Sequence, residues 1–325
     1  MRKAKKIFAA VVLILYMFSA CSVFGCASNA GNAKTDVYFI TKGSDSAFWR
    51  SVKSGAETAA AEFNVKLTFF EPSSEEAENE QNEFFERVIT DKPKAVAISA
   101  ISYNGSAAYI DRMVSAGVKV IMFDSGSKSS KASAEIMIDN FEAGRSAFLA
   151  LRERAAGKLS VGIVSPYEQT ENGSARVTGF IQAAQEDGNA VIAASSNVVS
   201  DMEEATLRAH EIIENYPEIN AIAAFNEWTT LGAGNAVESS GKSMEISVVG
   251  FDNNVRSIEH LEKGIIDALV VQNPYAMGYY SVQKAFLYAS GSLKKRSDVA
   301  VNIVVATREN MYNETVARLL FPFHN

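Results

Sequence analysis

Cysteine and proline are scarce in this chain, and their scarcity excludes several classes of protein. The 325 residues include 2 cysteines, both before position 27, so no disulfide framework can hold the fold together. The 6 prolines and 20 glycines form no repeat, which excludes collagen-like and low-complexity chains. Apolar residues make up 47% of the chain and charged residues 21%, as in folded globular proteins. At roughly 150 residues per domain, the length predicts two domains.

The chain also lacks an excess of basic residues. Lys and Arg number 31 against 38 Asp and Glu, and the formal net charge is −7. A chain of this sign has none of the phosphate attraction that supplies most nucleic-acid affinity. We therefore expect no nucleic-acid partner.

The residue groupings that catalysis usually requires are missing as well. The 3 histidines, His210, His260 and His324, are far apart without a second metal ligand at helical spacing, so we expect them on the surface. No phosphate-binding loop and no Gly-x-Ser-x-Gly motif occurs, and no cysteine follows Cys26. We predict no enzymatic activity, no cofactor and no metal site.

The N-terminus has the organisation of an export signal. Four basic residues lie within 1–6, an apolar run of twelve residues follows at 7–18, and Ser19 and Ala20 precede Cys21. Twelve apolar residues are too few to span ~30 Å of hydrocarbon as a helix. We predict a cleaved signal peptide at 1–20. An uncleaved anchor that extends through Phe24 is the alternative.

The two cysteines distinguish lipidation from plain secretion. The segments Phe18-Ser-Ala-Cys21 and Val23-Phe-Gly-Cys26 both resemble the lipobox of bacterial lipoproteins, whose cysteine carries lipid and becomes the new N-terminus. We favour Cys21, with Cys26 as the alternative, because Ser and Ala suit the two preceding places better than Phe and Gly. The resemblance implies an extracytoplasmic protein with a lipid anchor in the membrane. A short tether would cover 21–35.

From residue 36 onward, short apolar runs alternate with amphipathic helical stretches. Nine runs are typical of buried strands: 37–40, 65–70, 95–100, 118–123, 161–165, 190–194, 221–225, 246–251 and 268–272. Ser73 and Glu76 have the spacing of a capping box, which predicts a helix start there. Strands without polar alternation, separated by helices, predict parallel sheets in an α/β protein. So many units indicate either a barrel or two doubly wound sheets.

Polar residues collect just after several of the predicted strands. They are Lys42, Ser46, Asp124, Ser125, Asn226, Glu227, Asp252 and Gln272. Parallel sheets bind ligands beyond the carboxyl ends of their strands, in open sheets and in barrels alike. These residues are therefore candidates for one site.

Seven segments stand in order along the chain: Lys42-Gly-Ser-Asp-Ser-Ala-Phe-Trp49, Phe123-Asp-Ser-Gly126, Asp139-Asn140, Arg176-Val-Thr-Gly-Phe180, Phe225-Asn-Glu227, Val249-Gly-Phe-Asp252 and Val271-Gln-Asn-Pro274. Together they resemble the ribose-binding-protein type of periplasmic solute-binding proteins. The resemblance implies two doubly wound parallel-sheet lobes, the type I periplasmic binding protein fold. LacI-type repressors share this fold, but an export signal stands where their DNA-binding helices would be.

The resemblance also implies a hinge of three chain crossings. Lobe 1 would comprise 36–139 and 273–301, and lobe 2 would comprise 140–272 and 302–325. Such a protein would act as a monomer that closes around a sugar and delivers it to the permease of an ABC importer. In the alternative role, closure would be detected by a histidine kinase ectodomain or a chemoreceptor.

The ligand site follows from the resemblance residue by residue. The candidates are Lys42, Ser46, Phe48, Trp49, Asp124, Ser125, Arg176, Asn226, Asp252 and Gln272. The two aromatic residues would stack on a sugar ring, the two aspartates would accept hydrogen bonds from hydroxyls, and the arginine would donate. Carboxylates, amides, a guanidinium and aromatic faces match the hydroxyls and C–H faces of a sugar.

Most candidates also have a structural explanation that involves no ligand. Trp49 or Phe48 could belong to the core of their helix. The two aspartates could cap the segments that follow them, and the two amides could lie in a turn and a hinge. Arg176 could pair with Glu171 or Glu168 on a solvated face. Lys42 could be solvated, as most lysines are.

Departures from the family pattern limit how far the ligand can be named. Ser125 stands where ribose-type relatives have Arg, so we expect ribose to bind less well than another monosaccharide. Ser200 stands where relatives have an aromatic residue, and Tyr167 is the candidate to replace it. Lys42 with Asp124-Ser125 also resembles the autoinducer-2-binding branch of the family. We predict a monosaccharide ligand.

Overall fold

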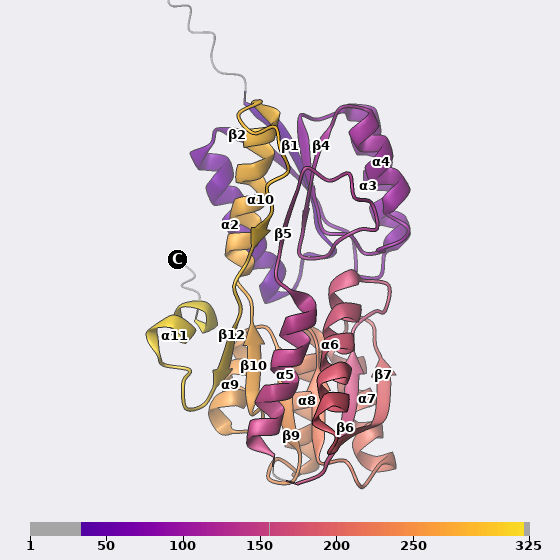
Figure 1. Ribbon diagram of the computed structural model, residues 1–325, viewed down its shortest axis with the longest axis vertical. Coiled ribbons are helices and arrows are strands. Elements are labelled where there is room, and N and C mark those ends of the chain that lie inside the picture. Colours follow the sequence, from indigo (N-terminus) through magenta and orange to yellow (C-terminus); the bar gives the residue numbers. More distant parts are fainter. Residues whose placement is uncertain (1–33, 156, 322–325) are drawn as a thin grey trace, which may run out of the picture. The chain divides into compact units, whose positions relative to one another are not determined.

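The computed structural model describes residues 34–155 and 157–321. Within that range the chain forms two sheets of six strands each (Figure 1). The prediction of two doubly wound sheets is therefore confirmed, and the alternative of a barrel is wrong. The predicted signal peptide, both cysteines and His324 lie outside the described residues.

All strand pairs of the first sheet are parallel. In sheet order, the strands are β11 (Val299–Ala300), β5 (Ala134–Met137), β4 (Lys119–Phe123), β3 (Ala95–Ile98), β1 (Thr35–Ile40) and β2 (Val65–Phe70). Helices α2 (Ala47–Glu62) and α10 (Pro274–Ala289) pack together on one face, and α3 (Glu78–Asp91) and α4 (Ala107–Ser115) cover the other. We call this sheet and its helices the first lobe.

The second sheet is parallel except for one edge strand. In sheet order, its strands are β12 (Val304–Thr307), β10 (Ala268–Val271), β9 (Ser247–Phe251), β8 (Ala221–Ala224), β6 (Leu159–Ser165) and β7 (Ala190–Asn197), and β12 runs antiparallel to β10. Helices α5 (Asn140–Arg154) and α6 (Glu171–Asp187) pack together on one face. The other face carries α7 (Met202–Asn215), α8 (Glu227–Ser240) and α9 (Val255–Lys263), and α11 (Glu314–Leu320) packs on β12. These elements form the second lobe.

The chain passes between the two sheets three times. It continues from β5 into α5, returns from β10 into α10, and leaves β11 for β12. Each lobe is therefore built from separated parts of the sequence. The residue boundaries of the lobes stay a prediction.

The central strands are buried along their whole length, which is why their sequences show no polar alternation. Every residue of β3, β6, β8 and β10 is buried. By contrast, three strands were not predicted: β5, β11 and β12, which have 4, 2 and 4 residues and are only partly buried. Partial burial distinguishes them from β3, β8 and β10, which also have 4 residues but are buried throughout.

The predicted capping box of Ser73 and Glu76 does not form. Helix α3 begins later, and Ala77 at its N-cap makes no side-chain cap bond. The Ser73 amide instead donates to Glu80 Oε2 at 2.7 Å. Glu76 Oε1 accepts from the backbone amide of Ser200 at 2.8 Å, so Glu76 contributes a bond between the lobes.

The predicted surface position of the histidines is wrong for His260, which is fully buried. Its imidazole lies against Gly234 of α8, where an added Cβ would be 2.2 Å from His260 Nδ1. Burial and the neighbouring Arg256 lower the pKa of His260. The ring therefore serves the packing of α8 and α9, outside the site described below.

Candidate functional site

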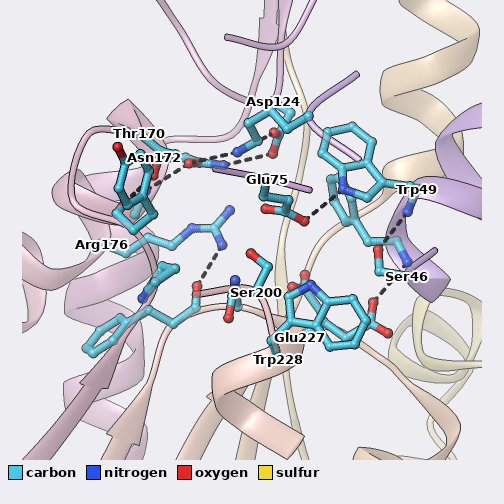
Figure 2. Close-up of a pocket in the computed structure, with 18 of the residues that line it drawn as sticks. Ser46, Trp49, Glu75, Asp124, Thr170, Asn172, Arg176, Ser200, Glu227 and Trp228 are labelled. Carbon is cyan, nitrogen blue, oxygen red and sulfur yellow. Dashed lines mark hydrogen bonds and ion pairs between the residues drawn. The ribbon is translucent and has the colours of Figure 1, made fainter. Parts of the chain in front are cut away.

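One pocket is lined by side chains of both lobes (Figure 2). The space between its walls amounts to about 490 Å³, part of it open to solvent. Nine of the ten predicted site residues line it: Lys42, Ser46, Phe48, Trp49, Asp124, Arg176, Asn226, Asp252 and Gln272. The exception is Ser125, which is fully buried and does not line the pocket.

Asp124 and Asp252 occupy equivalent places in the two lobes. Each directly follows a parallel strand, β4 or β9. Both have positive φ angles, 57° and 71°, which residues other than glycine rarely adopt. Strained backbone of this kind is concentrated at functional sites. The alternative that the two aspartates are helix caps is wrong, because the N-cap of α9 is Asn254 and Asp124 caps no described helix.

Three protein donors already surround the Asp124 carboxylate. Its Oδ2 accepts from the Ser99 hydroxyl at 2.7 Å and lies 3.1 Å from the Lys42 ammonium. Its Oδ1 accepts from the Asn172 side-chain amide at 2.9 Å. Lys42 also donates to Asn172 Oδ1 at 3.2 Å and is only 3% exposed, so the alternative of a solvated lysine is wrong. Since Asn172 belongs to α6, this triad of Lys42, Asp124 and Asn172 joins the lobes.

Arg176 reaches into the pocket from α6 (Figure 2). Its Nε donates to Asn140 Oδ1 and its Nη1 donates to the Phe225 carbonyl oxygen, both at 2.9 Å. Its Nη2 is buried and has no hydrogen-bond partner in the described part of the chain. A buried donor without a partner is costly, which indicates an acceptor supplied by a ligand. Arg176 forms no ion pair with Glu171 or Glu168, so that alternative is wrong.

Close packing of two helices holds Arg176 in place. An added Cβ at Gly144 of α5 would lie 1.9 Å from the Arg176 carbonyl oxygen. The reciprocal contact is at Gly179 of α6, where an added Cβ would lie 2.0 Å from the Phe141 carbonyl oxygen. The Arg176 guanidinium also lies over the Phe251 ring, 4.7 Å from its centroid.

Asp252 and Gln272 supply acceptors from the second lobe. Asp252 Oδ1 accepts from Gln272 Nε2 at 2.7 Å. Gln272 Oε1 is buried without a partner among the described residues. Burial raises the pKa of Asp252 to about 6, although Arg176 and Gln272 both favour its ionised form. Both groups therefore retain accepting capacity at the pocket.

Phe48 and Trp49 form an aromatic wall at the start of α2. Ser46 is the N-cap of this helix, and its hydroxyl accepts from the Trp49 amide at 3.1 Å. The two rings meet edge to face at 5.0 Å, and Trp49 also lies 6.3 Å from Phe123 of the core. Because Trp49 is 3% exposed and lines the pocket, it belongs to both the helix core and the wall.

The N-termini of α8 and α2 meet beside the pocket. Asn226 forms a capping box with Thr229 at the start of α8, so it is a cap residue as well as a lining residue. The next residue, Glu227, accepts from the backbone amides of Ala47 and Phe48, both at 3.1 Å. A carboxylate of the second lobe therefore satisfies the helix N-terminus of the first.

Several lining residues were not predicted. They are Glu75, Pro166, Thr170, Asn172, Gly173, Phe225 and Trp228, while Tyr167 and Ser200, both considered from the sequence, also line the pocket. Asn172 lies one helical turn before Arg176, a spacing that could have revealed it. Trp228 supplies an aromatic side chain of the second lobe. Glu75 carried no signal, because it is one of several acidic residues in its loop.

Glu75 is a partly buried carboxyl of the loop between β2 and α3. Its Oε1 accepts from Trp49 Nε1 at 2.8 Å (Figure 2). Burial raises the pKa of Glu75, and the Lys42 ammonium opposes that rise.

The pocket combines an aromatic wall with polar atoms that have no partner among the residues the structure describes. Arg176 Nη2 can donate, and Gln272 Oε1 can accept. A small polyhydroxyl molecule would satisfy both. Across residues 34–155 and 157–321, no group of three or more His, Cys, Asp or Glu is placed to hold a metal ion. In the same range, no helix is both long and apolar enough to cross a membrane.

Comparisons with known proteins agree with this architecture. The family model described as periplasmic binding protein domain matches residues 37–293. The ribose import binding protein RbsB of Bacillus subtilis is 25% identical over 294 residues, which cover 88% of this chain and 92% of that protein. The D-allose-binding periplasmic protein of Escherichia coli is 25% identical over 272 residues, which cover 81% of this chain and 88% of that protein.

Solved structures share the fold. A carbohydrate transporter solute-binding protein from Agrobacterium radiobacter, in complex with D-arabinose, superposes with a TM-score of 0.85 at 24% identity and covers 89% of this chain and 99% of its own. A sugar transporter from Clostridium phytofermentans reaches a TM-score of 0.75 at 27% identity, over 83% of this chain and 98% of its own. A chain of the XylFII-LytSN complex reaches 0.79 at 22% identity, over 85% of this chain and 98% of its own.

Proposed function

Because the chain belongs to the periplasmic binding protein domain family, we propose that it captures a monosaccharide in the pocket between its two lobes. One observation carries this proposal. Side chains from widely separated segments converge on the pocket, and buried Arg176 Nη2 and Gln272 Oε1 have no hydrogen-bond partner within residues 34–155 and 157–321. A sugar has hydroxyls that both donate and accept, so it can satisfy both atoms.

We propose a role toward the sugar for the residues of each wall of the pocket. Phe48 and Trp49 would face the C–H side of the ring. Arg176 would donate to a hydroxyl or ring oxygen, and Asp252 and Gln272 would accept from hydroxyls. Asn226 uses its Oδ1 in the α8 cap, which leaves its amide nitrogen to donate.

Delivery to an ABC importer is the role that we propose for the bound state. The ribose import binding protein and the carbohydrate transporter component named above support it. Closure of the lobes around the sugar would be the signal for docking on the permease. We propose that the protein does this as an extracytoplasmic monomer, anchored through Cys21 or Cys26, which both lie outside the described residues.

A sensor role is the second candidate. The XylFII-LytSN complex contains a chain of this fold together with a second protein, LytSN. In that role, closure around a sugar or an autoinducer-2-like ligand would be detected by a kinase ectodomain or a chemoreceptor instead of a permease. Loss of sugar uptake in a deletion strain would favour the importer, whereas intact uptake with a lost transcriptional response would favour the sensor.

A thermal-shift screen of monosaccharides tests the proposal. A bound ligand raises the unfolding temperature by mass action, whatever its chemistry. We expect at least one pentose or hexose to stabilise the protein, and D-ribose to stabilise it less than the best sugar, because Ser125 replaces an arginine. In calorimetry, Asp252→Ala should weaken binding of that best sugar by about 2–4 kcal/mol. The proposal fails if no sugar stabilises the wild type or if this variant binds with unchanged affinity.

A further inference from the structure

The first lobe presents two carboxylates to the pocket, Glu75 and Asp124, and they differ in how many partners they already have. The Asp124 carboxylate has three protein donors, Ser99 and Lys42 at Oδ2 and Asn172 at Oδ1. A carboxylate has about four lone-pair sites, so one accepting site remains for a ligand. Protein donors, including Lys42 and Asn172 of the triad that joins the lobes, therefore occupy most of the accepting sites of Asp124.

Glu75 has fewer hydrogen-bond donors around its carboxyl group than Asp124 has. Its Oε1 accepts from Trp49 Nε1 at 2.8 Å, and its Oε2 accepts no hydrogen bond from any described residue. Figure 2 shows the carboxyl inside the pocket, between the Trp49 ring and the Arg176 guanidinium. Glu75 is thus the carboxylate of this lobe with a whole oxygen available to a ligand.

The bond from Trp49 also fixes the orientation of Glu75. An indole N–H only donates, so it binds the carboxyl through an accepting oxygen, and Figure 2 shows the other oxygen on the side of the Arg176 guanidinium, inside the pocket. Trp49 itself is anchored between Phe48 and Phe123. A rigid aromatic residue therefore positions the Glu75 acceptor.

We propose that Glu75, rather than Asp124, is the ligand-binding carboxylate of the first lobe, and that its Oε2 accepts a hydrogen bond from one sugar hydroxyl. This inference rests on the proposed function. It assigns Asp124 a different task, which is to hold Lys42 and Asn172 together across the lobes. It also makes Glu75 a determinant of specificity, because a sugar without that hydroxyl would leave a desolvated carboxyl oxygen unpaired.

The test compares residue 75 with a matched glutamate outside the pocket. Glu75→Gln keeps an acceptor for Trp49 but replaces the free oxygen with an amide donor. Glu71→Gln is the control, because Glu71 pairs with Lys53 at 3.0 Å and does not line the pocket. D-ribose, D-allose, D-arabinose and D-fucose are titrated by calorimetry, together with the monodeoxy analogues of whichever sugar binds most tightly.

We expect Glu75→Gln to weaken binding of that sugar by about 10–100-fold and Glu71→Gln to leave it unchanged. One monodeoxy analogue should lack the hydroxyl that Glu75 binds. The wild type should bind the parent sugar more tightly than this analogue, whereas Glu75→Gln should bind the two with equal affinity, as a double-mutant cycle requires. Asp124→Asn should retain the same preference. A fold defect alone would weaken all sugars equally and would not remove this selectivity.

Two results would overturn the inference alone, and a third would overturn both the inference and the proposed function. Equal affinity of wild type and Glu75→Gln for the parent sugar removes Glu75 from the site. Selectivity that survives in Glu75→Gln but disappears in Asp124→Asn returns the role to Asp124. If no monosaccharide of the thermal-shift screen, these four included, binds the wild type, the inference and the proposed function fall together, whereas the first two results leave the proposed function standing.

Discussion

The two aspartates that follow β4 and β9 show how much the surroundings of one residue type decide. Asp124 lies 3.1 Å from the Lys42 ammonium and accepts two further hydrogen bonds. Asp252 is equally buried but accepts from the neutral amide of Gln272. Burial then dominates and raises the pKa of Asp252 to about 6. The same side chain on the same kind of backbone thus ties the lobes together in one place and stays open to ligand in the other.

The raised pKa of Asp252 predicts a pH-dependent stability. The folded protein holds this proton up to about pH 6 and the unfolded chain only up to its ordinary value of 3.8. The contribution of the Asp252 proton to the free energy of unfolding is therefore complete below pH 3.8, and it is lost as the pH rises through about 6. Between about pH 4 and about pH 7, the free energy of unfolding of wild type relative to Asp252→Asn should fall by about 2 kcal/mol.

Denaturant unfolding of both proteins at the two pH values measures this difference. Glu214→Gln is the control, since Glu214 is exposed and does not line the pocket. A constant difference between wild type and Asp252→Asn across this pH range would contradict the assignment of the proton to Asp252.

At the scale of elements, the start of α2 depends on a residue of the other lobe. Helix N-termini leave backbone amides without partners, and here Glu227 of α8 accepts from two of them. Asn254 holds the same carboxylate by donating to Glu227 Oε1 at 2.7 Å. This contact joins the two lobes, so under the proposed closure it would stabilise the closed arrangement and not either lobe alone.

Glu227→Gln should therefore weaken sugar binding without a comparable loss of fold stability. Loss of a charged acceptor at a helix N-terminus is worth about 1–2 kcal/mol, or roughly 5–30-fold in affinity. Glu203→Gln is the matched control, because Glu203 also lies in the first turn of a helix, α7, but is exposed. Calorimetric titration of the best sugar compares the two variants. Equal affinities would mean that the contact does not bias closure.

For the whole molecule, the predicted anchor decides where the pocket operates. Export and lipidation would place the protein outside the cytoplasm and hold it beside a membrane partner. Metabolic labelling with a fatty acid should mark the wild type and fail in Cys21→Ala, while Cys26→Ala should remain labelled. Label that persists in Cys21→Ala and disappears in Cys26→Ala would move the anchor to the second cysteine. Absence of label from the wild type would remove the lipoprotein prediction altogether.

Most of the pocket could be predicted because its residues follow strands or start helices, where sequence patterns are informative. Asp252 and Gln272 come directly after buried strands, and Ser46 and Asn226 are N-caps. Glu75 lies in a loop rich in acidic residues, and no local pattern separates it from its neighbours. The predicted capping box at Ser73 failed for a similar reason, since Glu76 is used in a bond to Ser200 of the other lobe.

The sequence by itself determined the alternation of strands and helices, the buried strands and the convergence of polar residues beyond them. The alternation and burial of the strands follow from local periodicity, which a single chain reveals. The expected convergence follows from the rule that parallel sheets bind ligands beyond the carboxyl ends of their strands, and the places of Phe48, Trp49 and Arg176 in the site came from the family resemblance. Only the tertiary structure decided which polar atoms find partners: Asp124 is enclosed by donors from both lobes, Glu75 keeps a free oxygen, and Ser125 is buried away from the lining. Hydrogen bonds act over about 3 Å, so their pattern depends on how distant segments are brought together in three dimensions.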